Sequence, residues 1–336
     1  MVERVREEVD EAATKETQSF PRFIFNQLRT ERTLRVAEKV GALIILRKWV
    51  WKVDELPCAK ESAGPYFDYV AQAVCNGQKN LKLSEGSKKF LPGFEKEISG
   101  VEEIPKKDPI LGIFNHWSDD GDDDGPLWGM WQHFLASEII SGAREAVKKD
   151  GKEVSQEVGW IMQDSLEVPL KIPKTNIRYQ TGWEAPASKF ILTDLISPAF
   201  DLITVTAPFK LIRGRQEHFV PVSIFRRLRN GGVVGLYPEA KPSRELAPAW
   251  EGSGKLVSMI AEKNPRTQIL PVGVYTEGKN QETKLFLRFG KPFPVSRCEN
   301  LKPGLIGRGM MAEIAQLLPE KYRGYYKNSH RYFSVA

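Results

Sequence analysis

Short apolar runs alternate with amphipathic stretches through the middle of the chain, from about residue 101 to residue 290. The runs are rich in β-branched and aromatic residues, as buried strands are, and the stretches between them repeat apolar residues at helical spacing. This alternation is typical of an α/β domain, with a mixed, largely parallel sheet flanked by helices. Strands are expected at 110–114, 160–162, 202–205, 233–237, 268–275 and 284–289, and helices at 126–137, 219–229 and 252–262.

The run 268–275 contains a proline, in Ile269-Leu270-Pro271-Val272-Gly273-Val274. Proline has no N–H to donate to a neighbouring strand, and in sheets it is confined to edges, bulges and strand starts. We therefore expect this strand to be interrupted at Pro271 and to lie at an edge, at a bulge or at the rim of an active site.

Two further regions flank the α/β domain (101–290). The N-terminal region (1–100) has a helical pattern, with one helix expected within 29–51 and a second within 66–74. The C-terminal region (291–336) has a helix expected at 308–318, and it then carries the basic, aromatic run Lys321-Tyr322-Arg323-Gly324-Tyr325-Tyr326-Lys327.

The stretch 29–52 has two interpretations. Its apolar run, 40–46, is far too short to span a bilayer, and it continues into Arg47-Lys48-Trp49-Val50-Trp51-Lys52. Bases and tryptophans beside a short apolar run are typical of a segment that lies in a membrane interface. The alternative is a helix packed on the main domain. The charged N-terminus shows no secretory signal, so we expect a peripheral membrane protein on the cytoplasmic side.

Composition narrows the class of partner. The hydrophobic share of 41% supports a globular core and argues against a disordered chain. The net charge of +6 suits an anionic membrane surface or phosphorylated substrates, and it is too weak to predict nucleic-acid binding. Three widely spaced cysteines, Cys58, Cys75 and Cys298, indicate neither a disulfide framework nor a zinc site, and so favour a reducing compartment.

The strand expected at 110–114 runs directly into Asn115-His116-Trp117-Ser118, and five aspartates follow within 119–124, around Gly121. Neutral imidazole is a good general base near neutral pH, and a carboxylate behind it fixes its tautomer and stabilises its charged form. We therefore interpret His116 as a candidate base at a strand end. A solvated loop histidine is the alternative.

The aspartates also match the start of a calcium loop, Asp120-x-Asp122-x-Asp124-Gly125. An EF-hand needs a bidentate Glu at the twelfth position, which is here Trp131 and cannot ligate. Pro126 suits the first position of a helix, so the acids precede a helix and we predict no dedicated metal site. A looser cation site stays open, because clustered carboxylates repel one another.

Two later loops carry residues suited to anions. Lys210-Leu211-Ile212-Arg213-Gly214-Arg215 sets two guanidinium groups around a glycine, which lets the backbone approach a phosphate. The strand at 233–237 runs into Pro238 and Glu239, and the loop that follows carries Lys241 and Arg244. On its own, each group also fits a solvated surface turn.

In their order along the chain these motifs resemble the glycerophospholipid acyltransferase superfamily, which includes 1-acylglycerol-3-phosphate acyltransferases and tafazzin-type enzymes. The resemblance covers about residues 108–290. It rests on Asn-His-x-Ser followed by Asp, on Arg-Gly-Arg, on Tyr-Pro-Glu after a Gly-Gly-Val-Val strand, and on Leu-Pro-Val. It is locally nearest to the tafazzin type, because Asn115-His116-Trp117-Ser118 runs into Asp123-Asp124 and then Leu127-Trp128-Gly129.

The chain departs from this family in two places. The family's Asp follows the His after four residues, and that position is here Gly121. If Leu127-Trp128-Gly129 anchors the comparison, Asp123 becomes the partner of His116, and Asp120 or Asp122 could serve instead. The family's Pro-Glu-Gly-Thr-Arg becomes Pro238-Glu239-Ala240-Lys241-Pro242, with Arg244 two positions later. These changes bear on the acceptor more than on the reaction.

The resemblance implies an O-acyltransferase that uses no cofactor. His116 would remove the proton from an acceptor hydroxyl, and one of the three aspartates would orient its ring. The substrate-binding residues would be Ser118, Arg213, Gly214, Arg215, Glu239, Lys241 and Arg244. The implied partners are acyl-CoA, acyl carrier protein or a phospholipid as donor, a lysophospholipid or glycerol phosphate as acceptor, and a membrane surface.

Two other classes stay open. One is a catalytically inactive relative that binds lipids or anions, which the altered Asp spacing and the missing Gly-Thr-Arg favour. The other is a metal-dependent phosphoester hydrolase built on the Asp cluster. It would need further ligands at strand ends, for which Asp164 and Asp201 are the best candidates.

Overall fold

The computed structural model describes residues 81–91, 94–117, 130–163, 170–171, 178–179, 203–205, 222–239, 243–278, 283–330 and 333. The expected helices within 29–51 and 66–74 lie outside these residues, as does the candidate interfacial segment 29–52. Within the described part of the chain, no helix is both long enough and apolar enough to cross a bilayer.

A mixed, mostly parallel sheet forms the centre of an α/β fold. Its strands run in the spatial order β1-β11-β10-β2-β9-β5-β8, and β12 also pairs with β10. Strands β10, β2, β9, β5 and β8 are parallel neighbours, whereas β11 and β12 run antiparallel to β10. The bounds are β1 Glu95–Ser99, β2 Ile110–Phe114, β5 Val158–Gln163, β8 Ile203–Val205, β9 Val233–Leu236, β10 Gln268–Glu277, β11 Lys284–Phe289 and β12 Phe293–Pro294.

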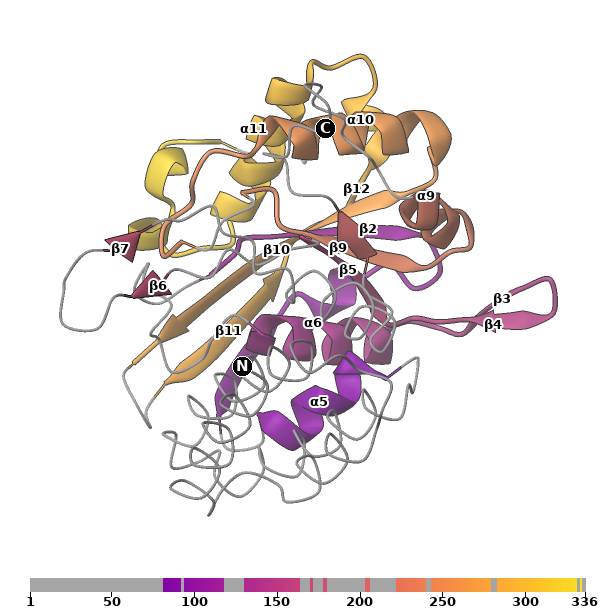
Figure 1. Cartoon of the computed structure of the whole chain (residues 1–336), viewed down its shortest axis with the longest axis horizontal. Coiled ribbons are helices and arrows are strands. Elements are labelled where there is room, and N and C mark those ends of the chain that lie inside the picture. Colours follow the sequence, from indigo (N-terminus) through magenta and orange to yellow (C-terminus); the bar gives the residue numbers. More distant parts are fainter. Residues whose placement is uncertain are drawn as a thin grey trace, which may run out of the picture.

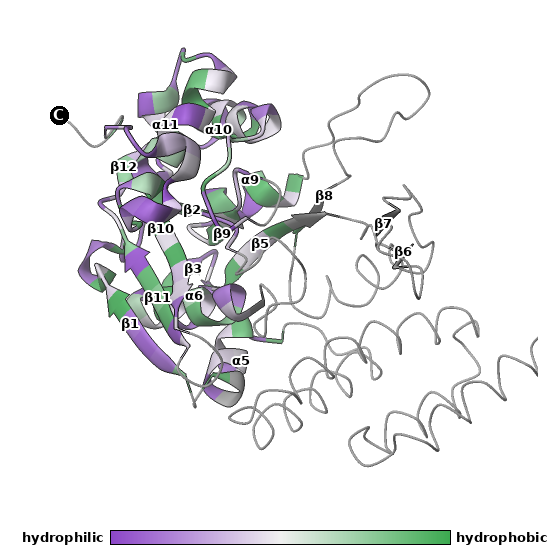
Figure 2. Ribbon diagram, turned by 90° about the vertical axis from the view of Figure 1, so that its left-hand side faces the viewer, coloured by the Kyte–Doolittle hydropathy of each residue, from purple (hydrophilic) through white to green (hydrophobic). Residues whose placement is uncertain are grey.

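Helices cover both faces of this sheet (Figure 1). On one face α6 packs on β5 and against α5, and on the other α9 contacts β9 while α11 contacts β10, β2 and α10. The hydropathy colouring shows hydrophobic stretches along strands such as β5 and β10 (Figure 2). The helices are α5 Leu83–Phe90, α6 Met130–Ala143, α9 Val222–Arg229, α10 Glu251–Lys263 and α11 Pro303–Ala315.

Short elements complete the described chain. Two small hairpins pair β3 (Val147–Lys149) with β4 (Lys152–Val154), and β6 (Leu170–Lys171) with β7 (Arg178–Tyr179). Single 3-10 turns are formed by Val101–Glu103, Val295–Cys298, Glu320–Tyr322 and Gly324–Tyr326.

The six expected strands are all present, and 110–114 and 284–289 match β2 and β11 residue for residue. Helix α6 continues to Ala143, past the expected end at 137, and α11 begins at Pro303, well before the expected start at 308. Glycines at 304, 307 and 309 weaken the helical signal in α11. On the facing helix, Gly254 of α10 packs closely on the start of α11, because a Cβ there would lie 2.0 Å from the carbonyl oxygen of Pro303.

The expectation for Pro271 was wrong, because β10 runs unbroken through it and lies inside the sheet, between β11 and β2. The carbonyl of Pro271 accepts a hydrogen bond from the N–H of Gly290, so its missing N–H faces the same side. On that side β12 pairs with 268–269 and β11 with 272–277, which leaves Pro271 at the junction between them. A proline is tolerated at this position of a central strand because neither β11 nor β12 needs a backbone N–H from residue 271.

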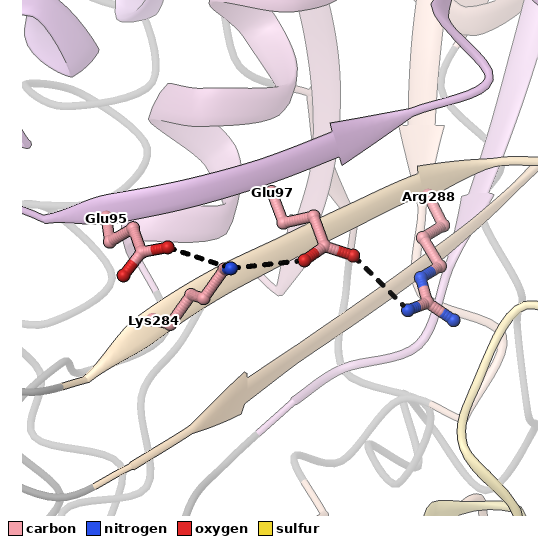
Figure 3. A network of polar contacts seen from close by, with 4 residues as sticks. All are labelled: Glu95, Glu97, Lys284 and Arg288. Atoms are coloured by element: carbon pink, nitrogen blue, oxygen red, sulfur yellow. Dashed lines mark ion pairs between the residues drawn. The ribbon is translucent and has the colours of Figure 1, made fainter.

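Strand β1 lies ahead of residue 101, where the sequence places the start of the α/β domain, and it is paired with β11 at the sheet edge. An ion-pair chain runs across these two strands (Figure 3). Lys284 Nζ lies 2.8 Å from Glu95 Oε1 and 3.2 Å from Glu97 Oε2, and Arg288 Nη2 lies 3.6 Å from Glu97 Oε1. Since solvent reaches these side chains and screens their charges, the pairs add little to stability.

Candidate active site

His116 and Glu239 lie side by side at the carboxyl ends of two neighbouring parallel strands. Strands β2 and β9 pair from Ile110 with Val233 to Ile113 with Leu236, a constant offset of 123 residues that also separates His116 from Glu239. The backbone N–H of His116 donates a hydrogen bond of 3.2 Å to Glu239 Oε2. The carboxyl edge of a parallel sheet is where α/β proteins place their ligands, so this pair is the candidate active site.

Amide side chains fix the residues on either side of His116. The side chain of Asn115 donates to the carbonyl of Val274 and accepts from its N–H, both at 2.7 Å. Gln132 of α6 donates to the carbonyl of Trp117 at 2.7 Å and accepts from its N–H at 3.4 Å. Because both neighbours are tied to other elements, His116 has little freedom to move.

The segment carrying Glu239 is held just as firmly. The carbonyl of Pro238 accepts hydrogen bonds from the N–H of Trp250 at 2.8 Å and from the hydroxyl of Ser253 at 3.0 Å, which ties it to the start of α10. The N–H of Ser243 donates to the carbonyl of His116 at 2.8 Å, and Ser243 forms a parallel bridge with Trp117. The loop after Glu239 therefore folds back along the residues that follow β2.

A layer of aromatic rings underlies His116 on the face of the sheet that α6 covers. The ring of Tyr237 stacks on His116 at 4.4 Å between centroids and on Trp160 at 5.4 Å, and the ring of His133 from α6 meets Tyr237 edge-on at 5.3 Å. The indole N–H of Trp160 donates to the hydroxyl of Ser137 on α6, at 3.1 Å.

Two glycines make room for this layer. Gly112 of β2 pairs with Gly235 of β9, which pairs with Trp160 of β5. A Cβ on Gly235 would lie 2.5 Å from the ring of Trp160, and one on Gly112 would lie 2.7 Å from the ring of Phe114. Large rings can therefore lie flat over the strands that end in His116 and Glu239.

Burial shifts the pKa of both candidate groups towards the neutral form. It lowers the pKa of His116 from 6.5 to about 3, with a further lowering from His133. It raises the pKa of Glu239 from 4.5 to about 8, against the opposing effect of hydrogen bonds that the carboxyl accepts from the backbone N–H groups of His116 and Ala247. Both shifts favour an uncharged imidazole beside an uncharged carboxyl group.

Three buried polar atoms in this cluster have no hydrogen-bond partner among the described residues: His116 Nδ1, Glu239 Oε1 and the hydroxyl of Tyr237. An unpaired buried polar group costs about 1–3 kcal/mol, so folded proteins rarely leave several together without a reason. The unpaired atoms of His116 and Glu239 can each form a hydrogen bond with a further polar group.

The structure brings together only part of the site expected from the sequence. His116 and Glu239 meet, whereas Arg244 is exposed on the loop after Glu239, with its guanidinium carbon 6.0 Å from the ring centroid of Tyr322. The other candidates lie outside the described residues: Ser118, Asp120, Asp122, Asp123, Lys241, Arg213, Gly214 and Arg215. The pairing of His116 with an aspartate thus stays a prediction, and in the described part of the chain no cluster of three His, Cys, Asp or Glu side chains suits a metal ion.

Sequence reasoning missed the residues that hold His116 in place, namely Asn115, Gln132, His133 and Tyr237. Asn115 was part of the motif but had no role assigned. Tyr237 ends the strand expected at 233–237, and the only sequence feature that marks it is its place in Tyr-Pro-Glu after an apolar run. No local signal marks Gln132 or His133, because their contacts depend on how α6 lies over the sheet.

Comparison with models of known protein families gives no match, and comparison with curated proteins gives none either. Among solved structures, the chain is similar to the 1-acyl-sn-glycerophosphate (LPA) acyltransferase PlsC from Thermotoga maritima, at 16% sequence identity and a TM-score of 0.36. The match covers 81% of this chain and 96% of that one.

Proposed function

We propose that this protein is an acyltransferase that moves a fatty acyl group from a thioester or phospholipid donor to the hydroxyl of a glycerol phosphate or lysophospholipid. One observation carries the proposal. His116 and Glu239 come from the first and third of the motifs whose order resembles the glycerophospholipid acyltransferases, and they meet at the carboxyl ends of adjacent parallel strands, where the backbone N–H of His116 donates a hydrogen bond to the Glu239 carboxyl. Such proximity is what a shared substrate site requires.

In the proposed reaction His116 acts as the general base. A ring nitrogen accepts the proton of the acceptor hydroxyl while the hydroxyl oxygen attacks the carbonyl carbon of the acyl donor. The tetrahedral intermediate collapses by breaking the carbon–sulfur bond of a thioester, and the leaving thiolate takes the proton back from the imidazolium. No covalent enzyme intermediate and no cofactor take part.

A buried imidazole with a pKa of about 3 is neutral, as a base must be, but it is weakly basic. A carboxylate at Nδ1 would raise this pKa by stabilising the imidazolium. We assign that role to an aspartate of the cluster, Asp123 first and Asp122 or Asp120 as alternatives. The unpaired, buried Nδ1 atom supports the assignment, because it leaves a place for such a partner.

The protonated carboxyl of Glu239 suits an anionic acceptor. A neutral acid does not repel phosphate, and its Oε1 atom can hold the acceptor through a hydrogen bond. Arg213 and Arg215 with Gly214 between them, and Lys241 and Arg244, are proposed to bind phosphate on the acceptor or on the donor carrier. Ser118 is proposed to contact substrate beside His116.

Acyl donors and lysophospholipids gather at membranes, so we propose that the protein acts as a peripheral protein on the cytoplasmic face, with acyl-CoA or acyl carrier protein as donor. The segment 29–52 is the proposed contact. Liposome sedimentation of the chain with and without these residues tests this part alone: equal pelleting of the two proteins would show that the segment does not mediate binding.

A second candidate is an inactive relative that binds lipids or anions. The low pKa of His116 favours it, since without a carboxylate partner this imidazole would be a poor base.

The deciding experiment offers purified protein labelled acyl donors with a panel of lysophospholipids, glycerol phosphate and simple alcohols or amines. We expect transfer to a phosphorylated acceptor, its loss in His116→Ala, and its retention in the control His330→Ala, since His330 is exposed near the C-terminus. Absence of transfer with every pair, despite binding of an acceptor, would favour the inactive relative. Transfer that persists in His116→Ala would defeat the mechanism.

A further inference from the structure

The basic, aromatic run near the C-terminus pairs with the loop that follows Glu239. The N–H of Leu246 donates to the carbonyl of Tyr322 at 3.0 Å, and the N–H of Tyr325 donates to the carbonyl of Leu246 at 3.2 Å. Between them Gly324 has φ of +44°, and a Cβ there would lie 2.6 Å from the carbonyl oxygen of Leu246. Only glycine allows this approach, so the segment (320–327, yellow in Figure 1) is shaped to hold the loop.

The ring of Tyr322 also reaches the residue next to His116. It is 4% exposed and meets the indole of Trp117 edge-on, with 4.7 Å between centroids. Both side chains are anchored on Thr276 of β10. The indole N–H donates to the Thr276 hydroxyl at 3.2 Å, and the Tyr322 hydroxyl donates to the Thr276 carbonyl at 3.4 Å. Tyr322 therefore contacts the side chain of Trp117, whereas Gln132 holds its backbone.

Two cationic side chains also lie over the ring of Tyr322. Arg244 lies over it at 6.0 Å, and Lys321 lies over it at 4.7 Å. Lys321 is also ion-paired with Glu277 at 2.8 Å, which anchors it to the end of β10. Arg244 is exposed, and a guanidinium group on an aromatic face is oriented while its N–H groups stay free to bind an anion.

We propose that Tyr322 is a positioning residue of the active site, which holds Trp117, and through it His116, while it orients Arg244 towards the substrate. This inference rests on the proposed acyl transfer and adds to it a part of the chain that lies outside the motifs. The C-terminal segment thereby joins the two halves of the site, one after β2 and one after β9.

The test compares four proteins in steady-state kinetics with the best substrate pair found for the wild type. In Tyr322→Ala we expect kcat to fall by about tenfold to a hundredfold, because a base displaced by about 1 Å loses that much rate. The KM for the phosphorylated acceptor should rise by about threefold, from the lost contact with Arg244. Tyr322→Phe keeps the ring and should restore both constants. Tyr325→Ala is the matched control, since its side chain is 68% exposed in the same segment.

A double variant separates positioning from general destabilisation. Arg244→Ala alone should raise KM and leave kcat unchanged, and adding Tyr322→Ala should raise KM no further, because both changes remove one interaction. Additive increases in KM would refute the proposal that Tyr322 orients Arg244. Hydrogen exchange supplies a readout without substrate: Tyr322→Ala should speed exchange in 243–250 and 114–117 relative to β11, and Tyr322→Leu should do the same if the alanine variant does not fold.

These experiments distinguish a failure of the positioning role from a failure of the proposed function. A wild type without turnover on any substrate pair defeats the proposed function, and with it the role of Tyr322. A wild type that turns over, with Tyr322→Ala equal to Tyr325→Ala in kcat, KM and hydrogen exchange, defeats the positioning role alone. Activity in Tyr322→Phe as low as in Tyr322→Ala, with hydrogen exchange equal to that of the wild type, would also overturn it, because the ring would then be in place without acting.

Discussion

Replacing Glu239 with Gln is expected to stabilise the protein, by an amount that grows with pH. The unfolded chain releases the Glu239 proton near its ordinary pKa of 4.5, whereas the folded protein holds it up to about 8. The free energy of unfolding therefore falls as pH rises between these values, because folding must keep a proton that the unfolded state has lost. Gln resembles the protonated acid in shape and does not titrate, so the variant escapes this loss.

Each pKa unit is worth about 1.4 kcal/mol, so the advantage of the variant should be near zero at pH 4.5, about 3 kcal/mol at pH 7 and about 5 kcal/mol above pH 8. Gln can still accept the hydrogen bond from the N–H of His116 through its amide oxygen. A constant offset from small changes in packing adds to the difference without changing its slope with pH.

Urea unfolding followed by tryptophan fluorescence at pH 5, 6, 7 and 8 measures this slope. Glu245→Gln is the matched control, since Glu245 is exposed on the same loop and its variant should follow the wild type at every pH. A difference between Glu239→Gln and wild type that does not change with pH would mean that Glu239 is ionised when folded, and it would refute the neutral-acid account of the site.

Three further changes test the surroundings of the pair. His116→Gln should be more stable than wild type at acid pH, by about 3 kcal/mol at pH 4 for a ring without a carboxylate partner, since the unfolded chain takes up a proton near pH 6.5 that the folded protein takes up only near pH 3. Pairing of Nδ1 with an aspartate would shrink this difference, and an equal loss of stability at acid pH in both proteins would contradict the low pKa. Asn115→Leu leaves the N–H and C=O of Val274 unpaired and should cost about 3 kcal/mol in urea unfolding, and a cost near zero would show that these bonds do not hold the strand end. Gly235→Ala should cost about 1–3 kcal/mol because its Cβ meets the Trp160 ring, whereas the control Gly142→Ala, with nothing within 4 Å, should be neutral or stabilising; equal effects on the denaturation midpoint would contradict the packing of the aromatic layer.

The sequence predicts the α/β class and the six main strands because buried strands carry a local signal in their runs of β-branched residues. It does not predict strand order. That β9 lies beside β2 with an offset that aligns His116 with Glu239 depends on long-range pairing, and nothing local to either motif specifies it. The place of Pro271 inside the sheet could not be predicted from the sequence for the same reason. The strand accommodates a proline there because β11 and β12, its two partners on that side, meet opposite it.

The candidate site was predictable where the chemistry lies in the motif itself. His116 can be singled out because few residue types act as a base at a strand end, whereas Glu239 alone also fits a solvated turn and is distinguished by the order of the motifs. The residues that hold this pair in place, Gln132, Tyr237 and Tyr322, cannot be singled out from the sequence. They act through contacts that form only once the helices and loops are placed. A polar or aromatic residue in such a role looks in the sequence like any other core or surface residue.

Single-turnover acyl transfer by wild type and His116→Gln at pH 7 shows whether His116 is the general base. Both proteins should be folded under these conditions, and urea unfolding confirms this beforehand. The account predicts transfer from acyl-CoA to a phosphorylated acceptor by the wild type, with a rate at least about a hundredfold lower in the variant, as expected for removal of a general base. Equal rates in the two proteins would contradict it.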